Sequence, residues 1–294
     1  GLDHLEPDLA HAGQTPCVIK MLALHRSEDW KCIDLFERES KLLKHLDHPH
    51  IPNYIDSFTL QDNEETYFFL VQEYVRGKTL AEWVEDGRRF QYAEVLTLAY
   101  QAADILAYLH SFQPPIIHRD LKPSNFMLDD NDKLWIIDFG AVRDTLLTQG
   151  TRGSTIIGTF GYMPMEQYEG RAQPASDLYA LGMTFIYLLT RQEPSQLPKH
   201  QLKPEFRSRC QVPESFARVL DRLVELDLHH RYRSAEKLRQ DIAHLQRKQE
   251  KRKFYLLTSA LKRLAVVRGS AAIAAVLVLL LGALAMIFTL GRES

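Results

Sequence analysis

The residues with the clearest capacity for chemistry lie in the middle of the chain. Asp120, Lys122 and Asn125 fall within IIHRDLKPSNFML (116–128), and Asp138 follows at the end of an apolar run. A carboxylate can accept the proton of a hydroxyl group, and an ammonium group can neutralise a phosphoryl group during its transfer. An amide oxygen and a second carboxylate are the hard ligands that Mg²⁺ prefers. These residue types at this spacing predict phosphoryl-transfer chemistry.

Two motifs here resemble the signature set of protein kinases: H-R-D with an asparagine five residues after the aspartate, and D-F-G. The resemblance covers roughly residues 10–245. It implies an α+β fold of the bilobal protein-kinase kind, with a small β-rich N-lobe and a larger helical C-lobe. Further matching segments are CVIK with Lys20, Glu39 on the next helix, GTFGYMPME (158–166), SDLY (176–179) and Arg231.

The resemblance implies a catalytic role for each matching residue of the central motifs. Asp120 would be the catalytic base, and Lys122 would neutralise charge on the transferred phosphoryl group. Asn125 and Asp138 would bind Mg²⁺. Thr159 would contact the loop that carries Asp120, near the substrate hydroxyl group.

The resemblance also implies a binding site for ATP in the first part of the chain. Lys20 would hold the α- and β-phosphates and pair with Glu39. The backbone of Glu73 and of Val75 would hydrogen-bond to adenine, beside Gln72 as the gatekeeper residue. In the same way, Arg231 would pair with Glu166 of the activation segment.

Several phrases resemble one bacterial branch of this family, the cyanobacterial-type eukaryotic-like serine/threonine kinases. They include LVQEYVRGKTL, PPIIHRDLKPSN and GTFGYMPMEQYEGRAQPASDLYALG. In this family, a lysine two residues after the H-R-D aspartate favours serine and threonine over tyrosine as substrates. Residues 141–161 are rich in Thr, Gly and Arg and are typical of a mobile loop. We expect Arg119 to bind phosphate there, on Thr148, Thr151, Ser154 or Thr155.

The chain departs from the family pattern in two places. No G-x-G-x-x-G precedes Lys20, since the sequence begins nineteen residues before it, and we expect a fragment truncated within the N-lobe. The family's A-P-E reads Pro164-Met165-Glu166, which affects the local turn more than the catalysis. These departures keep a second hypothesis open, a pseudokinase that signals as a membrane-tethered binding module. A small-molecule phosphotransferase is a more remote alternative.

Hydrophobic periodicity predicts strands first and helices afterwards, which is an α+β order. The expected strands are 17–22, 51–60 and 66–74, around a helix at 29–46, and the later helices are 92–112, 176–189, 216–226 and 235–245. The expected domains are an N-lobe at 1–75, a C-lobe at 76–246, a basic juxtamembrane segment at 247–268 and a transmembrane helix at 269–291.

Charge and hydropathy predict a membrane anchor at the end of the chain. Residues 269–291 contain no charged side chain, and about 20 apolar residues suffice to cross a bilayer core. Residues 247–268 carry eight Lys or Arg and one Glu, a net +7, against −9 for the rest of the chain. Because Lys and Arg stay on the cytoplasmic side of a membrane, we expect a single-pass membrane protein with a cytoplasmic kinase domain. The basic run would either contact anionic lipid or only orient the span.

The expected cofactors are therefore ATP and Mg²⁺, and the expected partners are protein substrates and the lipid bilayer. No nucleic acid is expected, and a homodimer is left open. Three scattered cysteines predict neither a disulfide framework nor a zinc site. His45, His48 and His50 lack carboxylate partners in the sequence nearby, so we expect no metal there.

Overall fold

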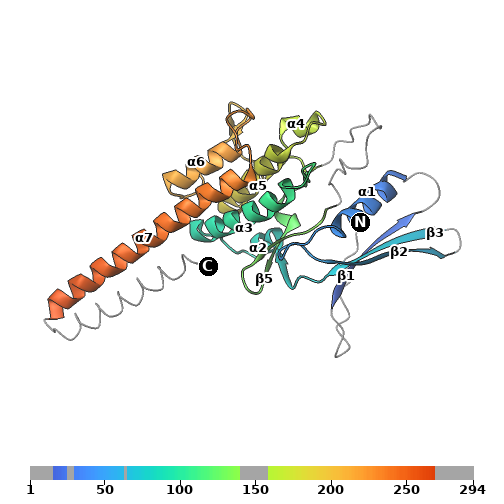
Figure 1. The fold of residues 1–294 in the computed structure, drawn as a ribbon. Helices are drawn as coiled ribbons and strands as arrows, with labels where there is room; N and C mark the ends of the chain where they lie inside the picture. Colours follow the sequence, from blue (N-terminus) through green and yellow to red (C-terminus); the bar gives the residue numbers. More distant parts are fainter. Residues whose placement is uncertain (1–15, 25–29, 63–64, 140–157, 269–294) are drawn as a thin grey trace. The chain divides into compact units, whose positions relative to one another are not determined.

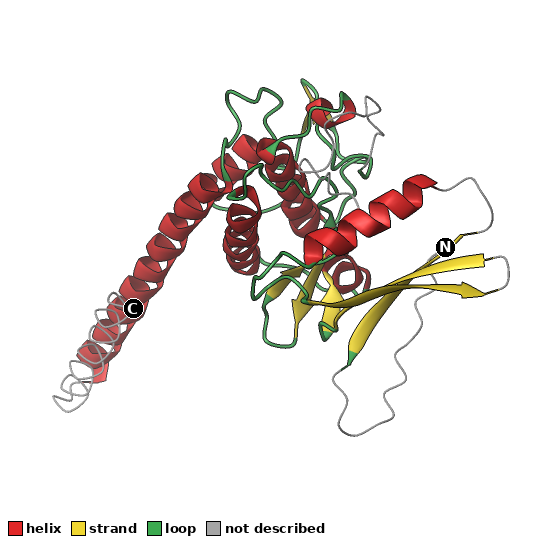
Figure 2. Cartoon of the chain, turned by 45° about the vertical axis from the view of Figure 1, so that its right-hand side comes forward, coloured by secondary structure: helices red, strands yellow, loops and turns green. Residues whose placement is uncertain are grey.

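The first part of the chain is built on a three-stranded antiparallel sheet in the order β1-β3-β2. The computed structural model describes residues 16–24, 30–62, 65–139 and 158–268. Its first strands are β1 (Cys17–Leu24), β2 (Tyr54–Asp62) and β3 (Glu65–Glu73), and helix α1 (Trp30–Leu43) lies across one face of the sheet (Figures 1 and 2). Phe36 of α1 meets Phe68 of β3 edge to face at 6.3 Å between ring centroids. This face therefore carries the packing between helix and sheet.

The pairing register decides which residues of β1 face the helix. Lys20 lies opposite Leu70 of β3, which is fully buried. Successive side chains of a strand point to opposite faces. Ile19 and Met21 therefore lie on the other face, where both are exposed. Lys20 is thus held on the side of the sheet that faces α1.

Two predicted boundaries in this part are wrong by a few residues. Strand β2 begins at Tyr54 rather than at 51, and α1 ends at Leu43 rather than at 46. Ile51 is buried in a turn, with its N–H donating to the carbonyl of His48 at 3.1 Å. Pro52 has no N–H to give to a strand ladder, which explains why pairing starts after it.

A second small sheet, in the order β4-β5-β6, follows the first. It consists of β4 (Gly77–Thr79), β5 (Phe126–Asp129) and β6 (Leu134–Ile136). Helix α2 (Leu80–Glu85) starts directly after β4. Thr79 and Glu82 form a reciprocal capping box there, a T-x-x-E pattern that the sequence analysis did not use. The short 3-10 helix η1 (Pro123–Asn125) leads into β5.

The larger core is helical and is centred on α5 (Pro174–Thr190), which is buried continuously from Ala175 to Leu188. A helix that is apolar all round belongs in a protein interior. It packs between α3 (Tyr92–His110) and α6 (Glu214–Leu223) (Figure 1). A Cβ on Gly182 would lie 2.6 Å from Cβ of Leu223, so glycine permits the close approach of α5 and α6. The short elements α4 (Met165–Tyr168), β7 (Lys199–His200) and β8 (Lys203–Pro204) complete this part.

The order of sheet and helices confirms the α+β architecture expected from the sequence. Residues 1–242 and 243–294 form two compact units. Helix α7 (Ala235–Arg268) continues far beyond the predicted 235–245 and includes the whole basic run. Among the described residues, no helix combines the length and apolar character that a membrane span requires. The predicted span at 269–291 lies outside the described residues.

Candidate active site

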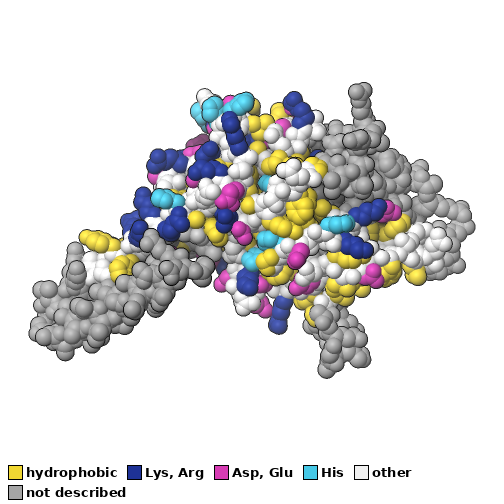
Figure 3. Space-filling view, in the orientation of Figure 1, with side chains coloured by type: hydrophobic (Ala, Val, Ile, Leu, Met, Phe, Trp, Pro, Cys, Tyr) yellow, Lys and Arg dark blue, Asp and Glu magenta, His cyan; other side chains and the backbone are white. Residues whose placement is uncertain are grey.

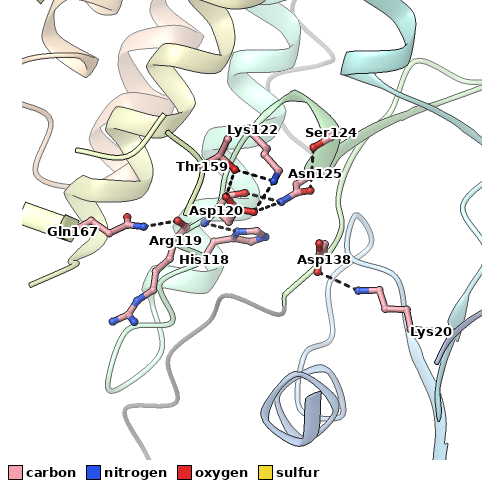
Figure 4. Close-up of polar contacts among 10 residues, drawn as sticks. All are labelled: Lys20, His118, Arg119, Asp120, Lys122, Ser124, Asn125, Asp138, Thr159 and Gln167. Carbon is pink, nitrogen blue, oxygen red and sulfur yellow. Dashed lines mark hydrogen bonds and ion pairs between the residues drawn. The ribbon is translucent and has the colours of Figure 1, made fainter. Parts of the chain in front are cut away.

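The centre of the site is the loop between α3 and η1, where Asp120 and Lys122 meet Thr159 (Figure 4). The Thr159 hydroxyl group donates to Oδ1 of Asp120 at 2.8 Å and accepts from Nζ of Lys122 at 2.9 Å. Nζ of Lys122 also lies 3.0 Å from Oδ2 of Asp120. The three side chains form one hydrogen-bonded cluster, although Thr159 is 37 residues from Lys122 in sequence.

Asn125 joins this cluster through its amide group. Nδ2 donates to the backbone carbonyl of Asp120 at 2.7 Å and to Oδ2 of the same residue at 3.2 Å. Because the amide nitrogen is held by Asp120, the orientation of the Asn125 side-chain oxygen is fixed, and Ser124 Oγ donates to this oxygen at 3.4 Å. An oxygen fixed in this way is suited to a hard cation such as Mg²⁺.

Lys20, Glu39 and Asp138 form the opposite side of the site. Nζ of Lys20 lies 2.6 Å from Oε1 of Glu39. It also lies 3.3 Å from Oδ1 of Asp138, across 118 residues of sequence (Figure 4). Burial alone lowers the pKa of Lys20, but the two carboxylates outweigh it and hold that pKa above its ordinary value. The backbone N–H of Phe139 donates to Oε1 of Glu39 at 3.2 Å, which ties the D-F-G segment to α1. Lys20 is therefore kept charged where phosphate groups would need it.

A buried aspartate that the sequence analysis gave no role, Asp177, holds the backbone of the catalytic loop. Its carboxylate accepts from the N–H groups of His118 and Arg119, each at 2.9 Å, and lies 2.9 Å from Nε2 of His110. Burial raises the pKa of Asp177, but these hydrogen bonds and the imidazoles outweigh it and the pKa is lowered. Arg119 has a φ of 71°, a strained value for a non-glycine residue, and Asp177 stabilises it. An aspartate in the first turn of a long, mostly apolar helix was the available signal.

Gln167 is a second residue without a role in the sequence analysis. Its Nε2 donates to the backbone carbonyl of Arg119 at 2.6 Å (Figure 4). Gly158, with a φ of 135°, lies against this contact, and a Cβ there would come within 2.8 Å of Nε2 of Gln167. The close approach of the Gln167 side chain to the backbone requires glycine at 158. Gly158 and Gln167 together therefore fix how the segment with Thr159 contacts the catalytic loop.

Glu166 and Arg231 form a buried ion pair at 2.6 Å between Oε1 and Nη1. The side chains are 8% and 1% exposed. Arg231 also donates to the carbonyls of Ala175 and Glu225, and Ser176 Oγ donates to Glu166 at 2.8 Å. The pair that the resemblance implied is thus present, and it connects α4 to α5 and to the segment after α6.

The predicted adenine-binding residues lie where the two sheets are joined. Residues 74–76 connect β3 to β4, and Gln72 and Val75 are buried. The N–H of Glu73 donates to the carbonyl of Asn53 at 2.9 Å, and its carboxylate accepts from Nδ2 of Asn53 at 2.8 Å. Because the N–H of Glu73 is already used, the predicted hydrogen bond between its backbone and adenine would have to be accepted by its carbonyl oxygen.

The site contains two oxygen donors of the kind that Mg²⁺ requires. Asp138 offers a half-exposed carboxylate, and Asn125 offers the oriented oxygen described above. Within the described ranges, no group of three or more His, Cys, Asp or Glu is arranged to hold a metal by itself. Mg²⁺ commonly takes one or two protein ligands and completes its shell with phosphate and water. Asn125 and Asp138 fit that pattern.

The residues predicted to be phosphorylated lie outside the described residues. They are Thr148, Thr151, Ser154 and Thr155.

The comparisons with known proteins agree with this geometry. Residues 9–254 match the family model of the protein kinase domain, and the chain belongs to that family. It is 35% identical over 247 residues to serine/threonine-protein kinase B of Synechocystis, covering 79% of this chain and 42% of that protein. It is 36% identical to serine/threonine-protein kinase PknA of Nostoc, covering 79% and 43%. It is 31% identical to serine/threonine-protein kinase PrkC of Bacillus subtilis, covering 76% and 35%.

These values support similarity to cyanobacterial serine/threonine kinases, the branch that the sequence phrases resemble. The chain spans less than half the length of these curated relatives. The family assignment therefore concerns the kinase domain.

Proposed function

We propose that this chain transfers the γ-phosphoryl group of ATP to serine or threonine hydroxyl groups of protein substrates. The observation that carries the proposal is the cluster of Asp120, Lys122 and Thr159. The pair of Lys20 with Glu39 and Asp138 supports it from the other side of the site. The printed names of the relatives point to the same substrate class.

The proposed reaction uses each of these side chains in a defined way. A carboxylate has about four lone-pair sites, so Asp120 can accept a substrate hydroxyl proton beside its present partners. Lys122 stabilises negative charge next to that carboxylate, and Thr159 orients both groups. Lys20 supplies a second positive charge for the phosphates, and Glu39 fixes its position. ATP with Mg²⁺, held by Asn125 and Asp138, would supply the phosphoryl group.

The direct test is transfer of labelled phosphate from ATP to a mixture of protein substrates, followed by identification of the labelled amino acids. We expect label on serine and threonine and none on tyrosine. When Mg²⁺ is chelated, the amount of transferred label should fall about 100-fold or more, because the charge of the phosphates is no longer neutralised. Label on tyrosine would contradict the proposed specificity.

The same assay separates the kinase from the pseudokinase. A pseudokinase would leave the substrates unlabelled while the chain still binds its partners. The assembled ion pair of Lys20 and Glu39 supports the active enzyme, because it holds an ammonium group where the phosphates of ATP would need it.

We also propose that the chain is a single-pass membrane protein with the kinase domain in the cytoplasm. The support is the uncharged stretch 269–291 and the excess of Lys and Arg before it. After cell lysis, we expect the full chain to stay in the membrane fraction through an alkaline carbonate wash, since an integral span resists it. Release of the protein into the wash would contradict this proposal.

A further inference from the structure

The second half of α7 has a surface that the proposed catalysis does not use. It contains Arg247, Lys248, Lys251, Arg252 and Lys253, against one acidic residue, Glu250. All five basic residues are exposed, and none forms an ion pair with another described residue. The first half of the helix differs, because there Lys237 pairs with Asp241, and Arg239 pairs with Glu236. The positive charge of residues 247–253 is therefore not neutralised by any side chain in the part of the protein that the structure describes.

Large apolar side chains follow these charges directly. Tyr255, Leu256 and Leu257 are 71%, 55% and 63% exposed. Figure 3 shows Lys and Arg side chains along this stretch of α7, followed by hydrophobic ones. Three consecutive exposed apolar residues in a helix are unusual for a surface that only meets water. We name residues 247–257 the basic–apolar segment.

The helical spacing orders the charges of this segment. Arg247, Lys248, Lys251 and Arg252 follow an i, i+1, i+4, i+5 spacing, which gathers them on one side of an α-helix. The apolar residues Tyr255, Leu256 and Leu257 are consecutive and so point in three directions around the helix, with Tyr255 on the side of Lys251 and Leu257 on the opposite side. The charges and the apolar residues are therefore separated along the helix, with basic residues at 247–253 and apolar ones at 254–257, as in a helix that meets the lipid headgroups first and the interfacial layer next.

We propose that the basic–apolar segment binds the surface of an anionic lipid bilayer. The Lys and Arg side chains would contact lipid phosphate and carboxylate groups, and Tyr255, Leu256 and Leu257 would enter the interfacial layer. Charge alone would equally suit a nucleic acid or an acidic protein, but neither explains the adjoining exposed apolar residues. The sequence also continues into the uncharged stretch 269–291, which agrees with a nearby bilayer. The proposal does not depend on kinase activity.

The test is amide hydrogen exchange of the full chain in lipid nanodiscs of two compositions, phosphatidylcholine alone and phosphatidylcholine with phosphatidylserine. We expect exchange in residues 247–257 to be about tenfold slower with phosphatidylserine. The difference should shrink below about threefold at about 0.5 M salt, because salt screens the lipid charge. Any insertion through 269–291 is common to both compositions and cancels in the comparison.

Three variants and an internal control sharpen this experiment. Changing Lys248, Lys251, Arg252 and Lys253 to Gln should abolish the difference between the lipids, whereas exchanging Lys for Arg and Arg for Lys at the same positions should preserve it. Changing Tyr255, Leu256 and Leu257 to Ser should reduce the protection although the charge is intact. Unchanged exchange in α5 would show that the kinase domain is folded in every variant.

The remaining outcomes are decisive. Equal exchange in both lipids for the unchanged chain would overturn the proposal, even if the protein is incorporated. Equal protection by soluble polyglutamate without lipid, persisting in the Ser variant, would overturn it in favour of an acidic macromolecule. If the protein is not incorporated into either nanodisc, the proposed span at 269–291 is contradicted. The lipid-binding proposal would then be tested with phosphatidylserine vesicles, and unchanged exchange in residues 247–257 on their addition would overturn it.

Discussion

Replacing Asp120 by asparagine is expected to lower the rate of phosphoryl transfer by about 10²–10⁴-fold, the usual contribution of a positioned general base. Asparagine keeps the shape of the side chain and can accept from Thr159 through its oxygen, but its amide nitrogen would then face the donors of Asn125 and Lys122, so the melting temperature is measured together with the rate. It cannot take up the proton of a substrate hydroxyl group. The measurement is the initial rate of labelled phosphate transfer from ATP at saturating substrate.

The matched control for this change is Asp130→Asn. Asp130 is an exposed carboxylate that pairs with Arg76 away from the cluster of Asp120, Lys122 and Thr159. The control should keep the rate within about twofold, because exposed ion pairs contribute little. Equal rates for Asp120→Asn and the unchanged protein would remove Asp120 from the proposed mechanism. Lost activity with a lowered melting temperature would instead indicate a structural role.

Replacing Glu166 by alanine is expected to destabilise the kinase domain by about 3–5 kcal/mol, because it leaves the Arg231 guanidinium charge buried without a carboxylate partner. The pair is almost fully buried, and Arg231 is additionally held by backbone carbonyls that cannot neutralise its charge. The measurement is the free energy of unfolding from urea denaturation.

Two further variants separate the buried charge from other effects of the change. In the double variant Glu166→Gln with Arg231→Met, no charge is left buried, so much of the stability should return. The exposed pair of Arg207 with Asp221 gives the surface comparison, and Asp221→Ala should cost less than about 1 kcal/mol. If Glu166→Ala cost no more than Asp221→Ala, the buried pair would not carry the stability assigned to it.

Local patterns in the sequence were enough for the order of the elements and for the central motifs. Asp120, Lys122 and Asn125 belong to one short stretch, so their closeness follows from the chain itself. Helices α3 and α5 have long apolar patterns, and each was predicted to within two residues at both ends. Boundaries were less accurate where a turn competes with a strand, as at Pro52 before β2.

The length of α7 could not be read from hydrophobic periodicity. Residues 247–253 are mostly basic, and such a pattern is compatible with either a solvated helix or an irregular segment. The structure continues the helix to Arg268. Lys, Arg, Leu and Ala are strong helix formers, so intrinsic propensity favours the helix there.

The sequence by itself determined the kinase motifs, the α+β order and the residues expected to meet ATP and the substrate hydroxyl group. Only the tertiary structure decided how those residues are held. Asp177 reaches backbone N–H groups 58 and 59 residues away, and Lys20 reaches Asp138 across 118 residues. Such contacts depend on how helices and strands pack, and packing depends on the whole chain at once. Spacing along a single segment therefore contains no record of them.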